Sequence, residues 1–197
     1  MEQVKKTTFI AFVNRKGGVT KTTSSVYVAT ALSKYGKVLL KDSDPQGSAT
    51  EWLEDIEDLP FNFELANQRN MRKANGYDYV VIDTPPGNPA LINEAINVAD
   101  FVIIPAEPSA MDISSVYAIV DAMKPDTLHR VLLTKVNPIT KSFRLAKEVL
   151  DEEKIPRFEI NIPRSEGIKN SFGKIPKESK ELEVYEGLVK EILELTE

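Results

Sequence analysis

Short apolar runs alternate with amphipathic stretches along most of the chain. The apolar runs are rich in Val, Ile and Leu without polar alternation, which is typical of strands buried on both faces of a parallel sheet. The amphipathic stretches carry apolar residues at helical spacing. We therefore expect an α/β fold, with a doubly wound and mostly parallel sheet flanked by helices. The expected strands are 8–13, 38–40, 79–82, 101–104 and 131–133, and the expected helices are 24–33, 49–53, 91–98, 113–123 and 143–150.

Two places in this pattern need closer attention. Asp112 is well placed to cap the helix that begins near Ile113. The pattern is least regular over residues 54–75, where 59–61 suits a short edge strand and 68–73 suits a helix.

Length and composition fit one globular domain over residues 1–197, because no linker or internal repeat divides the chain. Hydrophobic residues make up 42% and charged residues 28%, the balance of a protein that folds by itself. The absence of cysteine excludes disulfides, thiolate zinc sites and cysteine-ligated iron–sulfur clusters, and makes a cytoplasmic location the default expectation. The first apolar run is too short for a signal peptide or a membrane span.

The net charge of −5 hides a segregation of charge along the chain. Residues 1–123 carry 11 basic and 16 acidic side chains, residues 124–180 carry 13 and 8, and residues 181–197 carry 1 and 6. The basic segment 124–180 suits either a nucleic-acid contact or an ordinary solvated surface. The acidic C-terminal segment has apolar residues at helical spacing and is expected to pack on the fold, since anionic lipid would repel it.

A phosphate-binding loop lies between the first expected strand and helix. It reads Lys16-Gly17-Gly18-Val19-Thr20-Lys21-Thr22-Thr23, in the strand–loop–helix context that a P-loop requires. The paired glycines let backbone N–H groups turn toward phosphate oxygens, and the helix N-terminus adds its positive dipole end. Lys21 is placed to neutralise the β- and γ-phosphates, and Thr22 offers a hydroxyl to Mg²⁺. ATP and Mg²⁺ are therefore the expected cofactors.

Carboxylates end two further strands. Asp42 and Asp44 follow the strand 38–40 at positions i and i+2, where they can face a metal ion and an attacking water. Asp83 ends the strand 79–82 in the Walker B arrangement, which holds Mg²⁺ through water. The expected metal site consists of Thr22, Asp42 and Asp83.

Lys16 points to a particular class of P-loop protein, since an ordinary P-loop needs no lysine directly before its paired glycines. The sequence resembles the deviant Walker A ATPases, the superfamily of ParA and MinD. The resemblance implies a slow, partner-stimulated, Mg-dependent ATPase that forms a homodimer with ATP sandwiched between subunits. Lys16 would reach the partner's phosphates, Lys21 would serve its own subunit and Asp44 would position or activate water. The implied catalytic residues are Lys16, Lys21 and Asp44.

Further segments resemble ParA signatures. They are Asp42-Ser43-Asp44-Pro45-Gln46-Gly47-Ser48, Ile82-Asp83-Thr84-Pro85-Pro86-Gly87, Pro105-Ala106-Glu107-Pro108-Ser109, Ile162-Pro163-Arg164-Ser165 and Ser171-Phe172-Gly173-Lys174. With its phosphate loop close to residue 1, the chain is similar to the small type Ib, ParF-like ParA proteins, and the resemblance places Pro163 and Arg164 near the adenine. The implied nucleotide-binding residues are Lys16, Gly17, Gly18, Val19, Thr20, Lys21, Thr22, Thr23, Pro163 and Arg164.

Two positions depart from the family pattern. Thr20 stands where a third glycine is usual, and a threonine favours negative φ. Lys41 precedes Asp42 where an aliphatic residue is usual.

The resemblance implies DNA segregation, of a plasmid or a chromosome, as the leading function. The ATP-bound homodimer would bind non-specific DNA on the nucleoid, and a centromere-binding ParB-type partner would stimulate hydrolysis. The candidate DNA-binding residues are Lys141, Arg144, Lys147, Lys169 and Lys174. The alternatives are a MinD-like or cargo-positioning ATPase of the same superfamily and, less closely, a metabolic P-loop ligase. The acidic C-terminal segment argues against a membrane partner.

Overall fold

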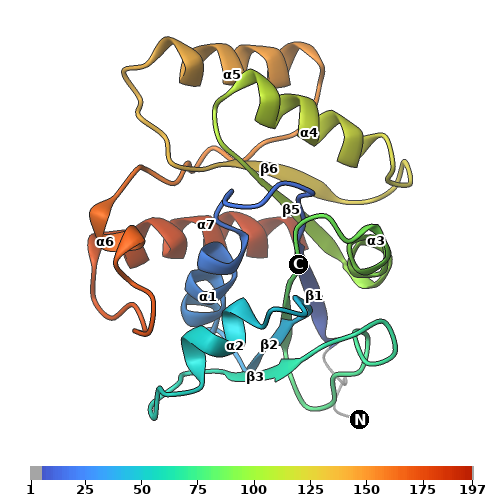
Figure 1. The fold of residues 1–197 in the computed structure, drawn as a ribbon, viewed down its shortest axis with the longest axis vertical. Helices are drawn as coiled ribbons and strands as arrows, with labels where there is room; N and C mark the ends of the chain where they lie inside the picture. The colour runs from blue at the N-terminus through green and yellow to red at the C-terminus, as the bar shows by residue number, and fades with distance from the viewer. Residues whose placement is uncertain (1–5, 197) are drawn as a thin grey trace.

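The structure, a computed structural model, describes residues 6–196 and contains one six-stranded sheet (Figure 1). The strand order is β3-β2-β4-β1-β5-β6, and every neighbouring pair is parallel. The expected parallel α/β architecture is thereby confirmed. The strands are β1 Thr8–Phe12, β2 Val38–Asp42, β3 Asn62–Leu65, β4 Tyr79–Asp83, β5 Phe101–Ala106 and β6 His129–Leu133.

Helices cover both faces of this sheet (Figure 1). Successive strand residues point to opposite faces, so Ile10 and Phe12 pack with α1 and α7, whereas Phe9 and Ala11 pack with α3 and α4. This two-sided burial explains why the central strands are apolar throughout. The helices are α1 Lys21–Leu32, α2 Ser48–Leu53, α3 Pro89–Val98, α4 Ala110–Val120, α5 Lys141–Glu152, α6 Glu166–Lys169 and α7 Lys180–Thr196.

The segment between α2 and β4 differs from the expected helix and strand. The edge strand β3 begins at Asn62, just after the expected 59–61. Residues 68–72 form turns and no helix covers 68–73. The reason is local: Asn67 and Asn70 use their side-chain oxygens to accept hydrogen bonds from nearby backbone N–H groups, which competes with helix formation.

Helix α4 begins earlier than expected, and its cap is a different residue. It starts at Ala110, and Ser109 is the N-cap, whose hydroxyl accepts a hydrogen bond from the backbone N–H of Asp112. Asp112 therefore lies inside the first turn, with its side chain buried, and does not cap the helix. This frees its carboxylate for the contact with the phosphate loop described below.

The C-terminal helix α7 packs against α1 along its apolar stripe, as expected. The Tyr27 and Tyr185 rings lie 4.6 Å apart between centroids, and the Tyr185 hydroxyl is 3.0 Å from the Ser24 hydroxyl. The six expected apolar positions are all buried: Leu182, Tyr185, Leu188, Val189, Ile192 and Leu193. Among residues 6–196, no helix is both long enough and apolar enough to cross a bilayer.

Lys41 lies wholly inside the fold, in the middle of the edge pair β2–β3. Its ammonium donates to the Glu64 carboxylate at 2.5 Å and to the Asn70 carbonyl oxygen at 2.9 Å. Lys41 and Glu64 are also paired in register across the two strands. Because neighbouring strand residues face opposite ways, Lys41 points away from the face that Asp42 uses. The unusual lysine thus anchors the edge strand and lies outside the phosphate site.

Candidate nucleotide-binding site

Two adjoining cavities lie at the carboxyl ends of the central strands, the usual ligand position in an open α/β sheet. The smaller, about 250 Å³, surrounds the phosphate loop, and the larger, about 440 Å³, lies beside it; Thr20 and Thr23 line both. The smaller cavity is lined by Gly17, Gly18, Thr20, Lys21, Thr22, Thr23, Asp44, Ser48, Thr84 and Pro86. A phosphate chain in one cavity and a base in the other would give a nucleotide a continuous site.

The phosphate loop contains two residues in the left-handed region. Gly18 has φ 77° and Thr20 has φ 68°. The expectation of a negative φ at Thr20 was wrong, because the loop keeps the left-handed backbone that turns it into α1 even though glycine is absent. A non-glycine residue costs about 1–2 kcal/mol in this conformation. Thr20 therefore stores backbone strain beside the phosphate cavity.

Lys21 is almost buried at the start of α1. Its ammonium donates to the Lys16 carbonyl oxygen at 2.9 Å. Burial lowers the pKa of Lys21, while the carboxylates of Asp83 and Asp44 act in the opposite direction. A triphosphate would supply the anion that this buried ammonium lacks in the cavity.

Asp83 is fully buried at the end of β4 and has one unsatisfied oxygen. Its Oδ1 accepts a hydrogen bond from Ser25 at 3.3 Å, and its Oδ2 has no partner among the described residues. Burial raises the pKa of Asp83 to about 7, with the nearby Thr22 hydroxyl opposing the rise and the Asp42 charge adding to it. An orphaned carboxylate oxygen beside a threonine hydroxyl fits a Mg²⁺ ion that keeps most of its waters. In the described chain, no three acidic or histidine side chains converge as a complete metal cage.

Asp42 and Asp44 have different environments. Asp42 accepts hydrogen bonds from the Asp44 backbone N–H at 3.0 Å and from Thr50, through its N–H and hydroxyl, at 2.8 and 2.9 Å. Both oxygens of Asp42 are therefore used to stabilise the turn between β2 and α2, which contains Asp44. Asp44 lines the phosphate cavity and is partly accessible. This geometry suits Asp44 to contact water and gives Asp42 a supporting place behind it.

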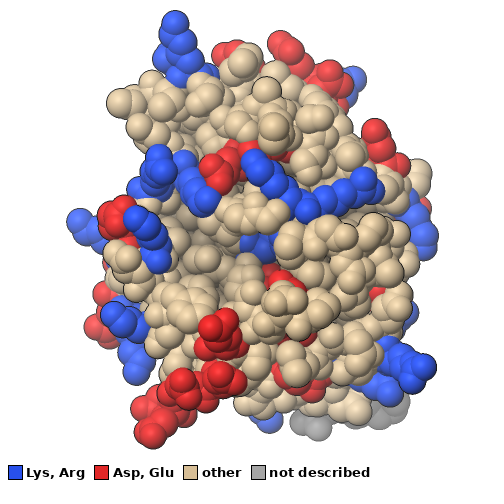
Figure 2. Space-filling model, viewed as in Figure 1, with Lys and Arg blue, Asp and Glu red and all other residues tan. Residues whose placement is uncertain are grey.

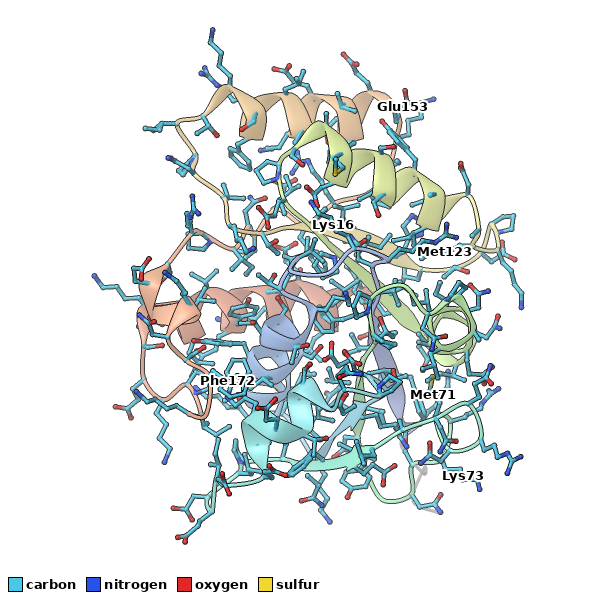
Figure 3. The ribbon with its side chains drawn as sticks, in the orientation of Figure 1. Lys16, Met71, Lys73, Met123, Glu153 and Phe172 are labelled. Carbon is cyan, nitrogen blue, oxygen red and sulfur yellow. The ribbon has the colours of Figure 1, made fainter. Side chains whose placement is uncertain are left out.

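Lys16 does not line the phosphate cavity in this structure. Its ammonium lies 2.9 Å from each carboxylate oxygen of Asp112. Figure 3 shows Lys16 in the loop between β1 and α1, near the start of α4. The signature lysine is thus paired inside its own subunit.

Asn14 is a residue of this site that the sequence did not single out. Its side chain is buried, donates to the Pro105 carbonyl oxygen at 2.7 Å, and accepts from the Lys16 N–H and the Ser115 hydroxyl, each at 2.9 Å. Asn14 therefore ties the phosphate loop to β5 and α4. Only its position directly before the loop could have drawn attention to it in the sequence.

The larger cavity contains both residues expected near the adenine, Pro163 and Arg164. Trp52 and Phe172 form one wall, with ring centroids 5.4 Å apart, and Phe172 lies beside α2 (Figure 3). Lys135 forms part of another wall and donates to the Gly18 carbonyl oxygen at 2.7 Å, which connects the two cavities. Aromatic and aliphatic side chains suit the face of a planar base, and the polar and charged residues that share the lining could bind its edges.

The remaining residues that were expected to bind nucleotide belong to the phosphate loop. Val19 differs from the others in its burial. Its side chain is fully buried, so only its main chain can contact phosphate. Gly17, Gly18, Thr22 and Thr23 all line the phosphate cavity.

The expected DNA-binding lysines and arginine lie in two groups. Lys141, Arg144 and Lys147 are on α5, which packs with α4, whereas Lys169 and Lys174 lie in the α6 segment beside α2, where the Lys174 carbonyl oxygen accepts from Trp52. Figure 1 shows the two groups on different parts of the molecule. In Figure 2, basic side chains form an interrupted band across the middle of this face, and acidic ones gather after α2. One subunit does not bring all five residues into a single patch.

The fold and this site define a P-loop nucleotide-binding protein, and the comparison with known families agrees. The model of the CobQ/CobB/MinD/ParA nucleotide binding domain matches residues 10–175. The chain belongs to this family and thereby to the ParA/MinD superfamily.

Individual proteins that this chain resembles have more narrowly defined roles than the family as a whole. Maintenance of carboxysome distribution protein A of Gloeobacter kilaueensis is 39% identical over 163 residues, which is 78% of this chain and 75% of the relative. The chromosome-partitioning ATPase Soj of Thermus thermophilus is 33% identical over 134 residues, 50% of this chain and 54% of the relative. Among solved structures, a variant of Cyanothece McdA in complex with ATP has a TM-score of 0.75 at 21% identity, over 95% of this chain and 96% of that one. At that identity the structural match shows the shared fold alone.

Proposed function

We propose that this protein is a Mg-dependent ATPase that positions a large cargo by a nucleotide-driven cycle of dimerisation and release. The observation that carries the choice of cargo positioning is the 39% identity to the carboxysome-distribution protein, over three quarters of that relative's length. A protein-bounded compartment is therefore the class of cargo favoured here. The sequence alone had favoured DNA segregation, and the relatives favour its alternative.

The ATPase part of the proposal rests on the geometry of the phosphate cavity. Lys21 and the loop N–H groups would bind the β- and γ-phosphates, and Thr22 and Asp83 would hold Mg²⁺. When bound, the metal ion neutralises negative charge on the phosphates. Asp44 faces the same cavity and would orient the attacking water, while Asp42 fixes the turn that carries Asp44. Lys16 would complete the site across a homodimer, as the superfamily resemblance implies.

DNA segregation remains a second candidate because the Thermus thermophilus relative is named a chromosome-partitioning ATPase. The exposed α5 residues Lys141 and Arg144 would then contact DNA phosphates, and their effect would weaken as salt rises. Both candidates share the same nucleotide chemistry and differ in what the protein moves.

Enzyme assays test the shared chemistry first. We expect purified protein to hydrolyse ATP slowly with Mg²⁺, and Lys21→Ala to lose binding and hydrolysis together. Asp44→Ala should retain nucleotide binding and lose hydrolysis. Wild-type protein that does not bind ATP with Mg²⁺ would remove the basis of both candidates.

Deletion of the gene in the source cell separates the candidates. For a positioning ATPase, a fluorescently labelled compartment should collapse from even spacing into clusters, while the replicon that carries the gene is inherited normally. For a segregation ATPase, the replicon should be lost while compartment spacing is unchanged. Complementation with the wild-type gene and with the Asp44→Ala variant shows whether the defect depends on hydrolysis.

A further inference from the structure

The two edges of the sheet differ in how their backbone groups are used. At the β6 edge, the N–H groups of Phe158 and Ile162 donate to carbonyl oxygens of β6 at 3.0 and 2.9 Å. The segment after α5 therefore covers this edge. At the other edge, β3 pairs with β2 and with no other strand of residues 6–196. The chain thus closes one edge of its sheet and leaves the other open to a further strand.

The backbone of β3 directs the groups of alternate residues to the open edge. Ala66, directly after β3, donates its N–H to the Asp42 carbonyl oxygen of β2 at 2.7 Å. Because alternate residues of a parallel strand bond to the same neighbour, Phe63 and Leu65 face the open edge with their backbone groups. Of these groups, the Leu65 carbonyl oxygen accepts from the Asn70 side chain at 3.1 Å. The Leu65 side chain is also 61% exposed, so an incoming strand would meet an apolar side chain as well.

Opposite charges lie at the two ends of this edge. We call residues 54–58, before β3, the acidic turn and residues 69–73, after β3, the basic turn. The acidic turn contains Glu54, Asp55, Glu57 and Asp58 and no cation, and the basic turn contains Arg69, Arg72 and Lys73 and no carboxylate. All these side chains belong to exposed residues, and none forms an ion pair with another described residue.

The figures show the same separation of charge. In Figure 1, β3 lies along the lower edge of the molecule, with α2 toward one end. In Figure 2, acidic side chains gather at the lower left and basic ones at the lower right. Figure 3 labels Lys73 of the basic turn at the lower right. The open edge therefore has a negative end and a positive end.

We propose that β3 is an interface between two copies of this chain, whose β3 strands pair antiparallel across a twofold axis. Antiparallel pairing places the start of one β3 beside the end of the other, so each acidic turn lies near the partner's basic turn. A parallel arrangement would bring like charges together. An axis at Phe63 is favoured, because Glu64 then lies opposite the partner's Asn62, whereas an axis at Glu64 would oppose two carboxylates.

This interface goes beyond the proposed ATPase cycle and does not depend on it. Neither β3 nor the two charged turns contribute a residue to the nucleotide cavities. The pairing therefore needs no nucleotide and leaves the phosphate loop accessible. Since β3 is only four residues long, the backbone contact is small and the charged turns supply much of the attraction. Salt should consequently weaken the dimer.

Sedimentation equilibrium of the full chain without nucleotide tests the interface. Raising NaCl from about 50 mM to about 500 mM should raise the dimer Kd about tenfold or more, because exposed charges are screened. Glu57→Lys with Asp58→Lys makes both turns basic, and Arg69→Glu with Arg72→Glu makes both turns acidic. Each double variant alone should be monomeric. An equimolar mixture of the two should form a heterodimer, which misfolded variants would not do.

Two further variants separate the strand pairing from general charge effects. Leu65→Pro removes an N–H that faces the open edge and no bond to β2, so the variant should fold and should not dimerise. Lys141→Glu with Arg144→Glu is the matched control, because it makes the same change of charge on α5, away from β3, and should leave the dimer intact.

Two results would overturn the interface. One is a wild-type chain that stays monomeric at low salt up to the highest soluble concentration. The other is a dimer that persists in Leu65→Pro and in both charge-reversed variants, which would place the contact elsewhere on the molecule. Because nucleotide is absent throughout, a chain that never hydrolyses ATP would still dimerise through β3, so the interface and the proposed function fail separately.

Discussion

At the scale of single residues, the phosphate loop combines a strained backbone with buried charge. Thr20 is held at φ 68°, Lys21 is almost buried, and Asp83 is fully buried with an orphaned oxygen. Each of these features is unfavourable in the nucleotide-free protein. Each would be offset by phosphate or Mg²⁺, so binding and stability should be tightly connected here.

The strain at Thr20 predicts a stabilising substitution. Thr20→Gly should raise the free energy of unfolding by about 0.5–1 kcal/mol, because relief of left-handed strain exceeds the extra chain entropy of glycine. Urea denaturation measures the change. Gly18→Ala is the control with the opposite expected effect: Gly18 has φ 77°, so an alanine there should be strained and should destabilise the protein. A destabilised Thr20→Gly variant would mean that the threonine side chain, 3.5 Å from the Ser24 hydroxyl, contributes more than the strain costs.

The buried Asp83 carboxyl predicts how stability depends on pH without Mg²⁺ or nucleotide. The pKa of Asp83 in the folded protein is about 7, above its ordinary value of 3.8. Between those values the folded state holds a proton that the unfolded state has released, so this carboxyl lowers the free energy of unfolding as pH rises from about 4 to 7, by up to about 1.4 kcal/mol per pH unit.

Denaturation in EDTA tests this expectation by comparison with Asp83→Asn. Subtracting the variant's pH profile from that of the wild type removes the contribution of all other groups. The difference in the free energy of unfolding, wild type minus variant, should fall as pH rises from about 4 to 7. A flat difference would show that Asp83 is ionised throughout.

At the scale of elements, the edge pair β2–β3 depends on one buried salt bridge. Lys41 is fully buried, whereas the Glu64 side chain is 45% exposed. Ordinarily an apolar residue would fill the Lys41 position on such a strand. The lysine instead reaches past β3 to the turn that contains Asn70 and so joins three segments.

This arrangement predicts an asymmetry between the two partners. Glu64→Gln should destabilise the protein by about 1–3 kcal/mol, because it leaves the buried ammonium without its counter-ion. Lys41→Met should be nearly neutral or stabilising, since it removes the charge and retains the volume. Thermal unfolding of both variants, alone and combined, gives the coupling energy. Equal losses from the two single variants would contradict the prediction.

At the scale of the whole molecule, the site joins parts of the chain that are far apart in sequence. The larger cavity is lined by Trp52 from α2 and by Pro163 and Arg164, and the Trp52 indole donates to the Lys174 carbonyl oxygen at 3.0 Å. Nucleotide would contact both groups of residues at once. Binding should therefore hold α2 and the segment around α6 together.

Trp52, the only tryptophan in the chain, makes this measurable. AMPPNP with Mg²⁺ should change the fluorescence of Trp52 with saturation, because the base would lie against the Trp52–Phe172 wall. Lys21→Ala should abolish the change at the same nucleotide concentration. Phe172→Leu, a change distant from the phosphates, should alter the spectrum while leaving phosphate binding largely intact. No fluorescence response from a protein that binds nucleotide calorimetrically would place the base elsewhere.

The sequence by itself determined the parallel α/β fold, the phosphate loop and the acidic strand ends. These depend on local rules: two-sided burial makes a strand apolar throughout, and a P-loop needs its glycines, lysine and threonine at close spacing. The burial of α7 also followed from its helical apolar stripe. Expectations that depended on contacts with nearby side chains were less reliable. At residues 68–73, hydrogen bonds to asparagine side-chain oxygens favour turns where a helix was expected.

Only the tertiary structure decided where the charged partners lie. The pairing of Lys16 with Asp112, of Lys41 with Glu64, and the separation of Lys141 from Lys169 all depend on how elements distant in sequence pack. The conformation of Thr20 belongs to the same class, because the fold imposes φ 68° on a residue whose own preference is negative. A sequence pattern records which side chains are present, whereas burial and long-range contacts decide which charge each one meets and what that contact costs to break.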